Sequence, residues 1–193
     1  MAKPRILAFA GSTRTDSFNK KLVRVAAASA EAAGAGVTVV DLGDLPMPLY
    51  DGDLEASDGL PPQAREFKEL LLAHQGLLIS SPEYNSSISA VLKNAIDWAS
   101  RPVPGEESLA CFKGKVAGLL AASPGALGGL RGLVHLRSIL GNISVIVVPE
   151  QAAVGKAHEA FDADGSLKDA SQKKMVDGVG AAVARLLLKI HGS

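Results

Sequence analysis

A short stretch near the amino terminus gathers hydroxyl, amide and guanidinium groups between two apolar segments. It reads Gly-Ser-Thr-Arg-Thr-Asp-Ser-Phe-Asn over residues 11–19. Ser12, Thr13 and Ser17 can donate hydrogen bonds through their hydroxyl groups. The Asn19 amide can also donate, and Arg14 adds positive charge and a fork of N–H donors. If a helix begins here, its free N–H groups and its dipole favour an anion as well. The stretch therefore predicts a seat for a phosphate monoester.

Two common nucleotide-binding loops are excluded by the residues at fixed positions of this stretch. The fingerprint Gly-x-Gly-x-x-Gly would need glycine at positions 13 and 16, where the chain has Thr and Asp. A P-loop would close with Gly-Lys and then Ser or Thr, which is also missing. A simpler alternative is that Ser17 or Asp16 only caps a helix and no ligand binds. That alternative explains neither the length of the stretch nor Arg14.

Short apolar runs alternate along the chain with longer amphipathic segments. The runs predict strands over 5–10, 37–41, 77–81, 116–122 and 143–148, and the segments predict helices over 19–33, 63–73, 90–100, 127–140 and 171–190. Such alternation is typical of a parallel sheet covered on both faces. We expect one domain over 1–193 with a flavodoxin-like α/β fold, a three-layer sandwich around five parallel strands in the order 2-1-3-4-5. Prolines predict a surface excursion without helix over 45–59, and 152–168 is expected to be loop.

In this strand order the first, third and fourth strands are neighbours, so the loops that follow them meet at the carboxyl edge of the sheet. These are residues 11–19, 82–85 and 123–129, called the first, second and third loops below. Because these loops are far apart in the sequence, their expected convergence carries more weight than any one motif. We therefore expect a ligand-binding crevice at this edge.

The second and third loops have side chains that suit a flat ring. Tyr84 offers an aromatic wall and Asn85 an amide, although a tight turn with Tyr84 packed inward is the alternative. Glu83 is assigned no catalytic role. In the third loop Ser123 is the most promising side chain, and Gly125 allows the backbone to approach a ring closely. The competing interpretation is that the third loop is only a turn before the next helix and binds no ligand.

Composition narrows the class of protein. The formal net charge is zero and aromatic residues are few, which argues against nucleic-acid binding. The single cysteine, Cys111, excludes an internal disulfide and a cysteine-based metal cluster. No run approaches the roughly 18 apolar residues of a membrane span, and the N-terminal apolar run is too short for a signal peptide. We expect a soluble, cytoplasmic protein without metal.

Three motifs together resemble a known family, the NADPH-dependent FMN reductases, which include quinone, azo-dye and chromate reductases. The motifs are Gly11-Ser12-x-Arg14-x-x-Ser17-x-Asn19-x-x-Leu22, Pro82-Glu83-Tyr84-Asn85 and Leu92-Lys93-Asn94-Ala95-Ile96-Asp97-Trp98. The resemblance extends from the first predicted strand through the fourth predicted helix. The chain departs from many relatives at Pro124, where they have a more flexible residue.

The resemblance implies non-covalently bound FMN, with NADPH or NADH as electron donor, and a homodimer or homotetramer. The first loop would take the FMN phosphate, the second would line the isoalloxazine ring, and Ser123 would lie near that ring. The predicted cofactor-binding residues are Ser12, Thr13, Arg14, Ser17, Phe18, Asn19, Pro82, Glu83, Tyr84, Asn85, Ser123 and Gly125.

The expected chemistry is carried by FMN, so no catalytic residue and no metal are assigned. NADPH or NADH would supply electrons that pass on to quinones, flavins, azo compounds or metal oxyanions such as chromate. One open face of the ring would make the two substrates alternate in a ping-pong scheme. The alternative is a flavodoxin-like electron carrier without its own nicotinamide oxidase activity, which usually has a strongly acidic surface. The neutral charge favours the reductase.

Overall fold

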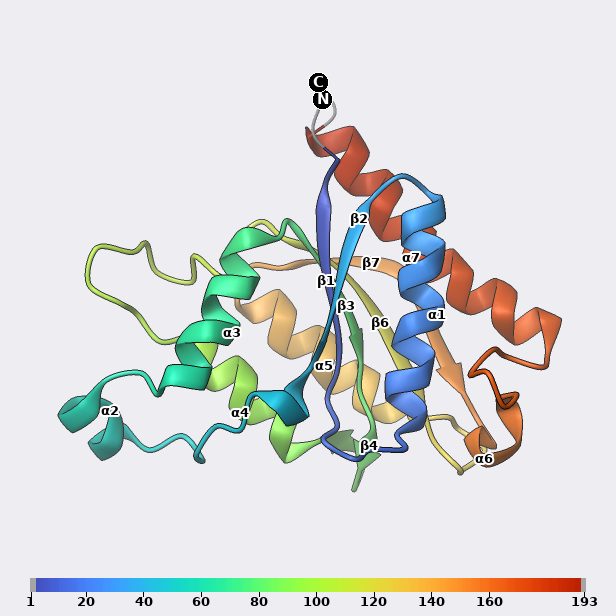
Figure 1. The fold of residues 1–193 in the computed structure, drawn as a ribbon, viewed down its shortest axis with the longest axis horizontal. Coiled ribbons are helices and arrows are strands. Elements are labelled where there is room, and N and C mark those ends of the chain that lie inside the picture. Colours follow the sequence, from blue (N-terminus) through green and yellow to red (C-terminus); the bar gives the residue numbers. More distant parts are fainter. Residues whose placement is uncertain (1–2, 192–193) are drawn as a thin grey trace.

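A computed structural model describes residues 3–191 and contains a five-stranded parallel sheet with helices on both faces (Figure 1). The strands lie in the order β2-β1-β3-β6-β7. Their bounds are β1 Arg5–Ala10, β2 Gly36–Asp41, β3 Gly76–Ser80, β6 Val116–Ala122 and β7 Ile146–Val154. Because β6 and β7 are the fourth and fifth strands of this sheet along the chain, the predicted order 2-1-3-4-5 is confirmed.

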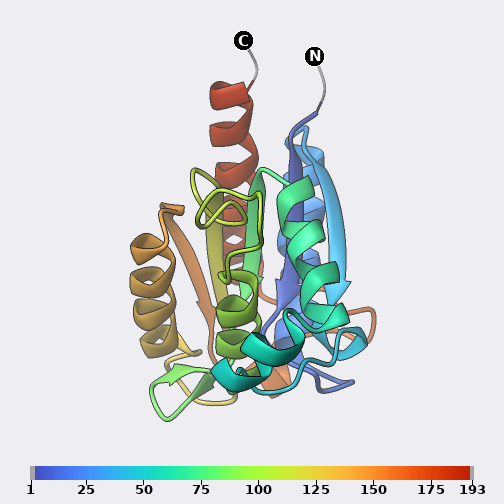
Figure 2. The same cartoon turned by 90° about the vertical axis from the view of Figure 1, so that its left-hand side faces the viewer.

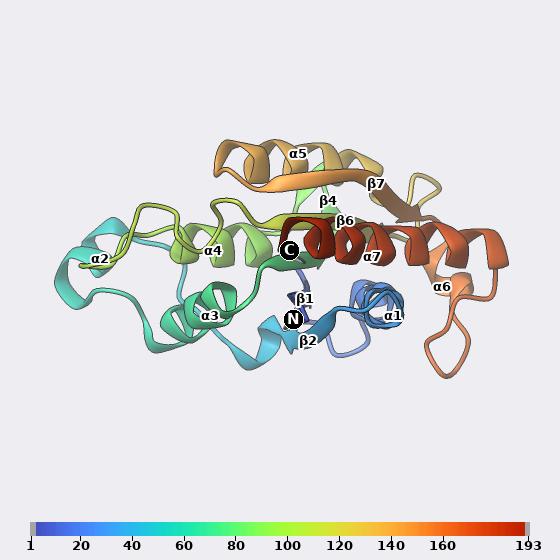
Figure 3. The same cartoon turned by 90° about the horizontal axis from the view of Figure 1, so that it is seen from above.

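Five long helices form the two outer layers. Helices α1 (Phe18–Ala32) and α7 (Ala170–His191) cover one face of the sheet. Helices α3 (Pro62–Ala73), α4 (Ala90–Ala99) and α5 (Leu130–Asn142) cover the other, the face turned toward the viewer in Figure 2. Figure 3, seen from above, shows the sheet between the layers. The three-layer sandwich expected from the sequence is therefore present.

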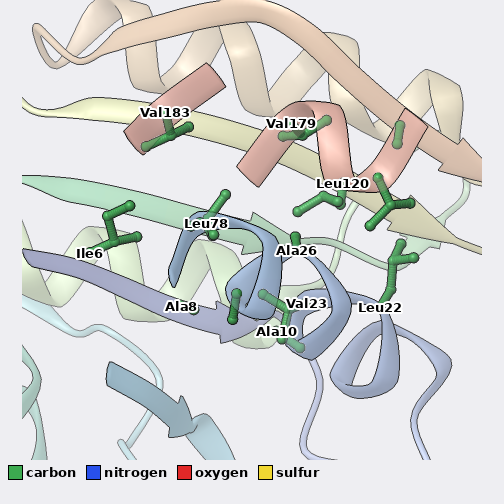
Figure 4. Close-up of a cluster of buried hydrophobic side chains, with 14 of the residues drawn as sticks. Ile6, Ala8, Ala10, Leu22, Val23, Ala26, Leu78, Leu120, Val179 and Val183 are labelled. Atoms are coloured by element: carbon green, nitrogen blue, oxygen red, sulfur yellow. The ribbon is translucent and has the colours of Figure 1, made fainter. Parts of the chain in front are cut away.

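Alternation along the central strands divides the core in two. Ile6, Ala8 and Ala10 of β1 face α1 and α7 (Figure 4), whereas Leu7 and Phe9 face the opposite layer. All of them are buried, as expected for a central parallel strand covered on both faces. The two helices of the first layer also touch directly. A Cβ on Gly180 of α7 would overlap the backbone oxygen of Ala26 in α1, so glycine permits this close packing.

Four short elements accompany the sheet. They are a 3-10 turn η1 (Leu42–Asp44), helix α2 (Gly52–Asp58), an antiparallel hairpin of β4 (Glu83–Tyr84) and β5 (Ser87–Ile88), and helix α6 (Ala157–Ala160). The expectation of no helix over 45–59 was wrong. Pro46 and Pro48 precede α2 and do not interrupt it. Asp51 caps its N-terminus by accepting a hydrogen bond from the Asp53 N–H, at 2.9 Å.

The segment that carries α2 is tied to α4. The Pro48 carbonyl accepts hydrogen bonds from Trp98 Nε1 and Asn94 Nδ2, both at 2.8 Å. The Tyr50 N–H donates to Asn94 Oδ1, also at 2.8 Å, and Arg101 pairs with Glu55. The motif containing Asn94 and Trp98 thus holds this excursion onto the body of the protein.

The last strand also differs from the sequence prediction. A strand was expected over 143–148, followed by loop over 152–168, but β7 runs from Ile146 to Val154 and α6 follows. The register against β6 slips between Ala117 and Leu119, which pair with Val147 and Gln151. Pro149 lies in this irregular part of an edge strand, where a missing N–H is tolerated. Among the described residues, the helices all fall short of the length and apolarity that crossing a membrane requires.

Candidate functional site

The three loops meet in a cleft of about 230 Å³ at the carboxyl edge of the sheet. This edge cleft is lined by Ala122, Pro124 and nine of the twelve residues predicted to bind cofactor, namely Ser12, Arg14, Ser17, Phe18, Asn19, Pro82, Glu83, Tyr84 and Ser123. In Figure 1 it lies at the end of the molecule where β4 and the turn from β1 into α1 are drawn. The convergence expected from the strand order is therefore present.

The first loop leaves β1 in tight contact with its neighbours. The Gly11 N–H donates to the Ser80 carbonyl at 2.9 Å, which extends the pairing with β3. The Gly11 carbonyl accepts from the Ser89 hydroxyl at 2.6 Å. A Cβ on Gly11 would stand only 2.8 Å from Cβ of Leu92 in α4. Glycine is therefore needed for the loop to pass this close to α4.

At the N-terminus of α1 several donors remain available. The Ser17 hydroxyl caps the helix by accepting from the Lys20 N–H at 3.4 Å, which leaves its own proton free to donate. The N–H groups of Phe18 and Asn19 have no acceptor among the described residues. The exposed Arg14 guanidinium likewise makes no ion pair or hydrogen bond there. This end of the edge cleft therefore gathers hydrogen-bond donors, one of them the charged guanidinium, that have no acceptor among the described residues.

Asp16, the one carboxylate of the first loop, forms an ion pair with a lysine. Asp16 pairs with Lys21 of α1 at 2.6 Å, and hydrogen bonding to Lys21 lowers the pKa of the Asp16 carboxyl. Asp16 is absent from the lining of the edge cleft. Its negative charge is thus compensated away from the donors that face the cleft.

The Asn19 side chain also has a structural role within the protein. Its side chain is buried and accepts from the Ser80 hydroxyl at 2.8 Å and from the Ala122 N–H at 2.9 Å. Its Nδ2 donates to the Ala122 carbonyl, again at 2.9 Å. The side chain therefore joins α1 to the ends of β3 and β6. Its second Nδ2 hydrogen and the backbone N–H are the Asn19 donors that have no acceptor among the described residues.

In the second loop, Pro82, Glu83 and Tyr84 line the edge cleft and Asn85 does not. The loop is the first strand of the β4–β5 hairpin, which sequence reasoning missed. Asn85 and Ser86 form its two-residue turn and both have positive φ, 50° and 64°. Such a turn usually carries glycine, so the usual sequence signal was absent. Tyr84 is 56% exposed, which makes it an open wall of the cleft.

In the third loop, Ser123 lines the edge cleft and Gly125 does not. The Ser123 backbone is fixed by hydrogen bonds to Val154 and Ala157, both 3.1 Å long. The Gly125 carbonyl accepts from Gly128 and Lys156, so this part of the loop is packed against the chain after β7. The backbone of the loop is therefore held rigidly beside the cleft.

Thr13 also lies outside the edge cleft. It contributes to a separate, mainly apolar hollow of about 220 Å³ between the first loop and α4, with Leu42, Met47 and Val91 among its other walls. Of the twelve predicted residues, Thr13, Asn85 and Gly125 are thus not brought into the common cleft. Conversely, sequence reasoning missed Ala122 and Pro124, which immediately flank the predicted Ser123.

The donors of the edge cleft fit the phosphate of FMN. Hydroxyl groups of Ser12 and Ser17, the Arg14 guanidinium and free N–H groups at a helix N-terminus are the groups that bind phosphate monoesters in proteins. Tyr84, Pro82 and Pro124 give the other end apolar and aromatic walls that suit a ring. The residues present are therefore compatible with a flavin mononucleotide.

Comparison with known proteins supports the same assignment. A model of the family described as NADPH-dependent FMN reductase matches residues 4–159. The chain is 36% identical over 189 residues to an NAD(P)H-dependent FMN reductase of Pseudomonas aeruginosa, covering 97% of each chain. It is 35% identical over 192 residues to a probable NADPH:quinone oxidoreductase of Oryza sativa subsp. japonica, covering 97% of this chain and 91% of the relative.

A solved structure is similar over nearly the whole chain. The flavoenzyme NAD(P)H:(acceptor) oxidoreductase from Paracoccus denitrificans superposes with a TM-score of 0.80 and 30% sequence identity, covering 96% of this chain and 98% of that one. Fold, sequence and the donors of the edge cleft thus agree. The chain belongs to the NADPH-dependent FMN reductase family.

Proposed function

We propose that this protein is an NAD(P)H-dependent oxidoreductase that uses FMN bound in the edge cleft to reduce quinones. The observation that carries this proposal is the unpartnered donor set at the N-terminus of α1, beside Arg14 and Ser17. Family membership and relatives named quinone oxidoreductases support it. When bound, FMN supplies the redox chemistry by taking a hydride from a nicotinamide and passing electrons to an acceptor.

In this proposal the residues of the chain bind FMN and orient its ring. We propose that Ser12, Arg14 and Ser17, with the N–H groups of Phe18 and Asn19, hold the phosphate. Pro82, Tyr84 and Ser123 would line the ring end. Among the residues lining the edge cleft, Glu83 is the one carboxylate, and it is already bound to Arg131 and Gly132. We therefore assign the chain no acid, base or nucleophile in the proposed reaction.

The size of the edge cleft bears on the order of the reaction. Its volume of about 230 Å³ is below the roughly 300–1,000 Å³ of pockets that enclose a whole drug-sized ligand. It could enclose only part of a flavin nucleotide, which leaves a face for nicotinamide and acceptor to use in turn. Initial rates at several concentrations of both substrates should give parallel double-reciprocal lines, as ping-pong kinetics requires. Intersecting lines would show that both substrates bind together.

The acceptor is tested with a steady-state panel on FMN-loaded protein. A benzoquinone, free FMN, an azo dye and chromate are compared with NADPH and with NADH as donor. We expect the quinone to give the highest kcat/KM. A higher value for another acceptor would replace quinone in the proposal without altering the role of FMN.

Mixing the purified protein with NADPH alone separates the reductase from an electron carrier. A reductase bleaches its flavin absorbance without a partner protein, and a flavodoxin-like carrier does not. Protein that is colourless and binds no added FMN would contradict both functions.

We also propose that the enzyme is cytoplasmic, that residues 1–193 form one FMN-binding domain, and that it assembles as a homodimer or homotetramer. Support for assembly comes from Leu127, Leu130 and Val134, three large apolar side chains that are exposed on or just before α5. Light scattering coupled to gel filtration should give two or four times the chain mass of 19.8 kDa. A mass of one chain would exclude this assembly.

A further inference from the structure

The hairpin that carries Tyr84 is too small to hold its own shape. Glu83 pairs with Ile88 and Tyr84 with Ser87, and these are its only strand pairs among the described residues. An isolated two-stranded hairpin is at best marginally stable in water, even when it is longer. Other contacts must therefore fix the position of Tyr84 at the edge cleft.

Those contacts come from the first turns of α5. Glu83 Oε1 accepts from Arg131 Nε at 2.9 Å and lies 2.7 Å from Arg131 Nη2. Glu83 Oε2 accepts from the Gly132 N–H at 3.1 Å. One turn further along, His135 Nδ1 lies 3.0 Å from the Ser87 hydroxyl. Both strands of the hairpin are thus attached to one helix.

The free N–H groups at the N-terminus of α5 need a hydrogen-bond acceptor from another part of the chain. Gly129, at its N-cap position, has φ 93° and no side chain to accept a hydrogen bond. The Glu83 carboxylate takes that place, where the helix dipole also favours a negative charge. Gly132 makes room for it, because a Cβ there would stand 3.2 Å from the Ser87 carbonyl oxygen and 3.5 Å from Glu83 Cβ.

Burial alone would raise the pKa of the Glu83 carboxyl. The Gly132 N–H and the Arg131 guanidinium outweigh that effect, so the pKa lies below its usual value. The group is therefore an anion at neutral pH. The side chain of Glu83 is 9% exposed, whereas that of Arg131 is 60% exposed. A largely covered anion is thus neutralised by a cation that stands largely in solvent.

We propose that Glu83 and Arg131 form a latch that couples the second loop to α5, and so positions Tyr84 and sets the charge at the ring end of the edge cleft. Both are positioning residues. The proposal rests on the proposed function where it concerns FMN, whereas the latch itself is a property of the FMN-free protein.

The first experiment uses FMN-free protein and amide hydrogen exchange. In Arg131→Ala and in Glu83→Gln, peptides covering 82–89 and 130–134 should exchange about tenfold faster than in wild type, because a charge-assisted contact is lost. Lys113→Ala is the matched control, since its ion pair with Glu107 is 3.8 Å long and exposed. Unchanged exchange in both latch variants would overturn the latch.

The second experiment uses FMN-loaded protein and measures the flavin midpoint potential. Arg131→Ala leaves the Glu83 charge uncompensated beside the cleft, so the potential should fall. Glu83→Gln removes that charge, so the potential should rise. Simple loosening of the hairpin would shift both variants in the same direction. That result would overturn the electrostatic part of the proposal, whereas failure of wild type to bind FMN would contradict only the proposed function.

Discussion

Asn19 and Ala122 are 103 residues apart in the chain, yet they share two hydrogen bonds of 2.9 Å. The amide of the first pairs with the backbone N–H and C=O of the second as a neighbouring strand would. Ser80 donates to the same Asn19 oxygen. The N-terminus of α1 is thereby attached to two strand ends, and the edge cleft lies among these three elements.

Asn19→Ala should lower the free energy of unfolding by about 2–4 kcal/mol. The variant loses three buried hydrogen bonds and leaves the polar groups of Ala122 without partners. The measurement is urea unfolding of the FMN-free protein. Asn142→Ala, at an exposed asparagine without a hydrogen bond among the described residues, is the control. Equal urea midpoints for the two variants would contradict the role given to Asn19.

Replacing both Arg14 and Ser17 by alanine should weaken FMN binding by a few kcal/mol, since hydrogen bonds to a charged group contribute about 1.5–3 kcal/mol each. Titration of the FMN-free protein with FMN, followed by quenching of flavin fluorescence, gives the affinity. Arg24→Ala serves as control, because this exposed arginine of α1 is absent from the lining of the edge cleft. Retention of FMN at wild-type affinity in the double variant would place the phosphate elsewhere.

Gly11→Ala should destabilise the protein by about 1–3 kcal/mol, because the new methyl group would stand 2.8 Å from Leu92 Cβ. Gly141→Ala provides a matched comparison in α5, where an added Cβ meets nothing within 4 Å. That change should be neutral or stabilise by up to about 1 kcal/mol. Thermal unfolding of both variants tests the pair, and similar melting temperatures would show that α4 can move away from the first loop.

Asp41 should make part of the stability depend on pH. Burial raises the pKa of its carboxyl. Lys20, 2.6 Å away, and the Gly43 N–H together lower this pKa by more than burial raises it, so the net pKa is depressed. A depressed pKa stabilises the fold above the ordinary value near 3.9, and the gain is lost as pH falls through the lower folded value.

The difference in unfolding free energy between wild type and Asp41→Asn should therefore be constant above about pH 5 and shrink in more acidic solution. Urea unfolding at a series of pH values measures it. Asp58→Asn, at an exposed carboxylate without an ion pair among the described residues, should show little difference at any pH. A difference for Asp41→Asn that does not change as the solution is made acidic would be the contrary result.

The central strands could be predicted from the sequence because burial on both faces leaves a continuous apolar run. For β1 and β6 the predicted and observed bounds agree, Arg5–Ala10 and Val116–Ala122. The strand order then followed from general rules for parallel sheets, and it was enough to bring the three loops to one edge.

The remaining features depend on contacts that no local pattern records. Helix α2 is short and exposed, and its place is fixed by hydrogen bonds from Asn94 and Trp98 of α4 to Pro48. The hairpin turns without glycine at Asn85 and Ser86, and Glu83 in its first strand is bound to α5. The amide of Asn19 could not be assigned, since its partner Ala122 offers only a backbone. Long-range polar contacts decided each of these points.

Trp98 gives the protein a natural optical reporter. It is the single tryptophan of the chain, it is fully buried, and its indole N–H is fixed on the Pro48 carbonyl. Its emission therefore comes from one site and one environment, on the helix whose other end is bound to the first loop through Ser89. Energy transfer from this indole to a flavin would let FMN loading be followed in unlabelled protein, and a red shift would report release of the α2 segment from α4.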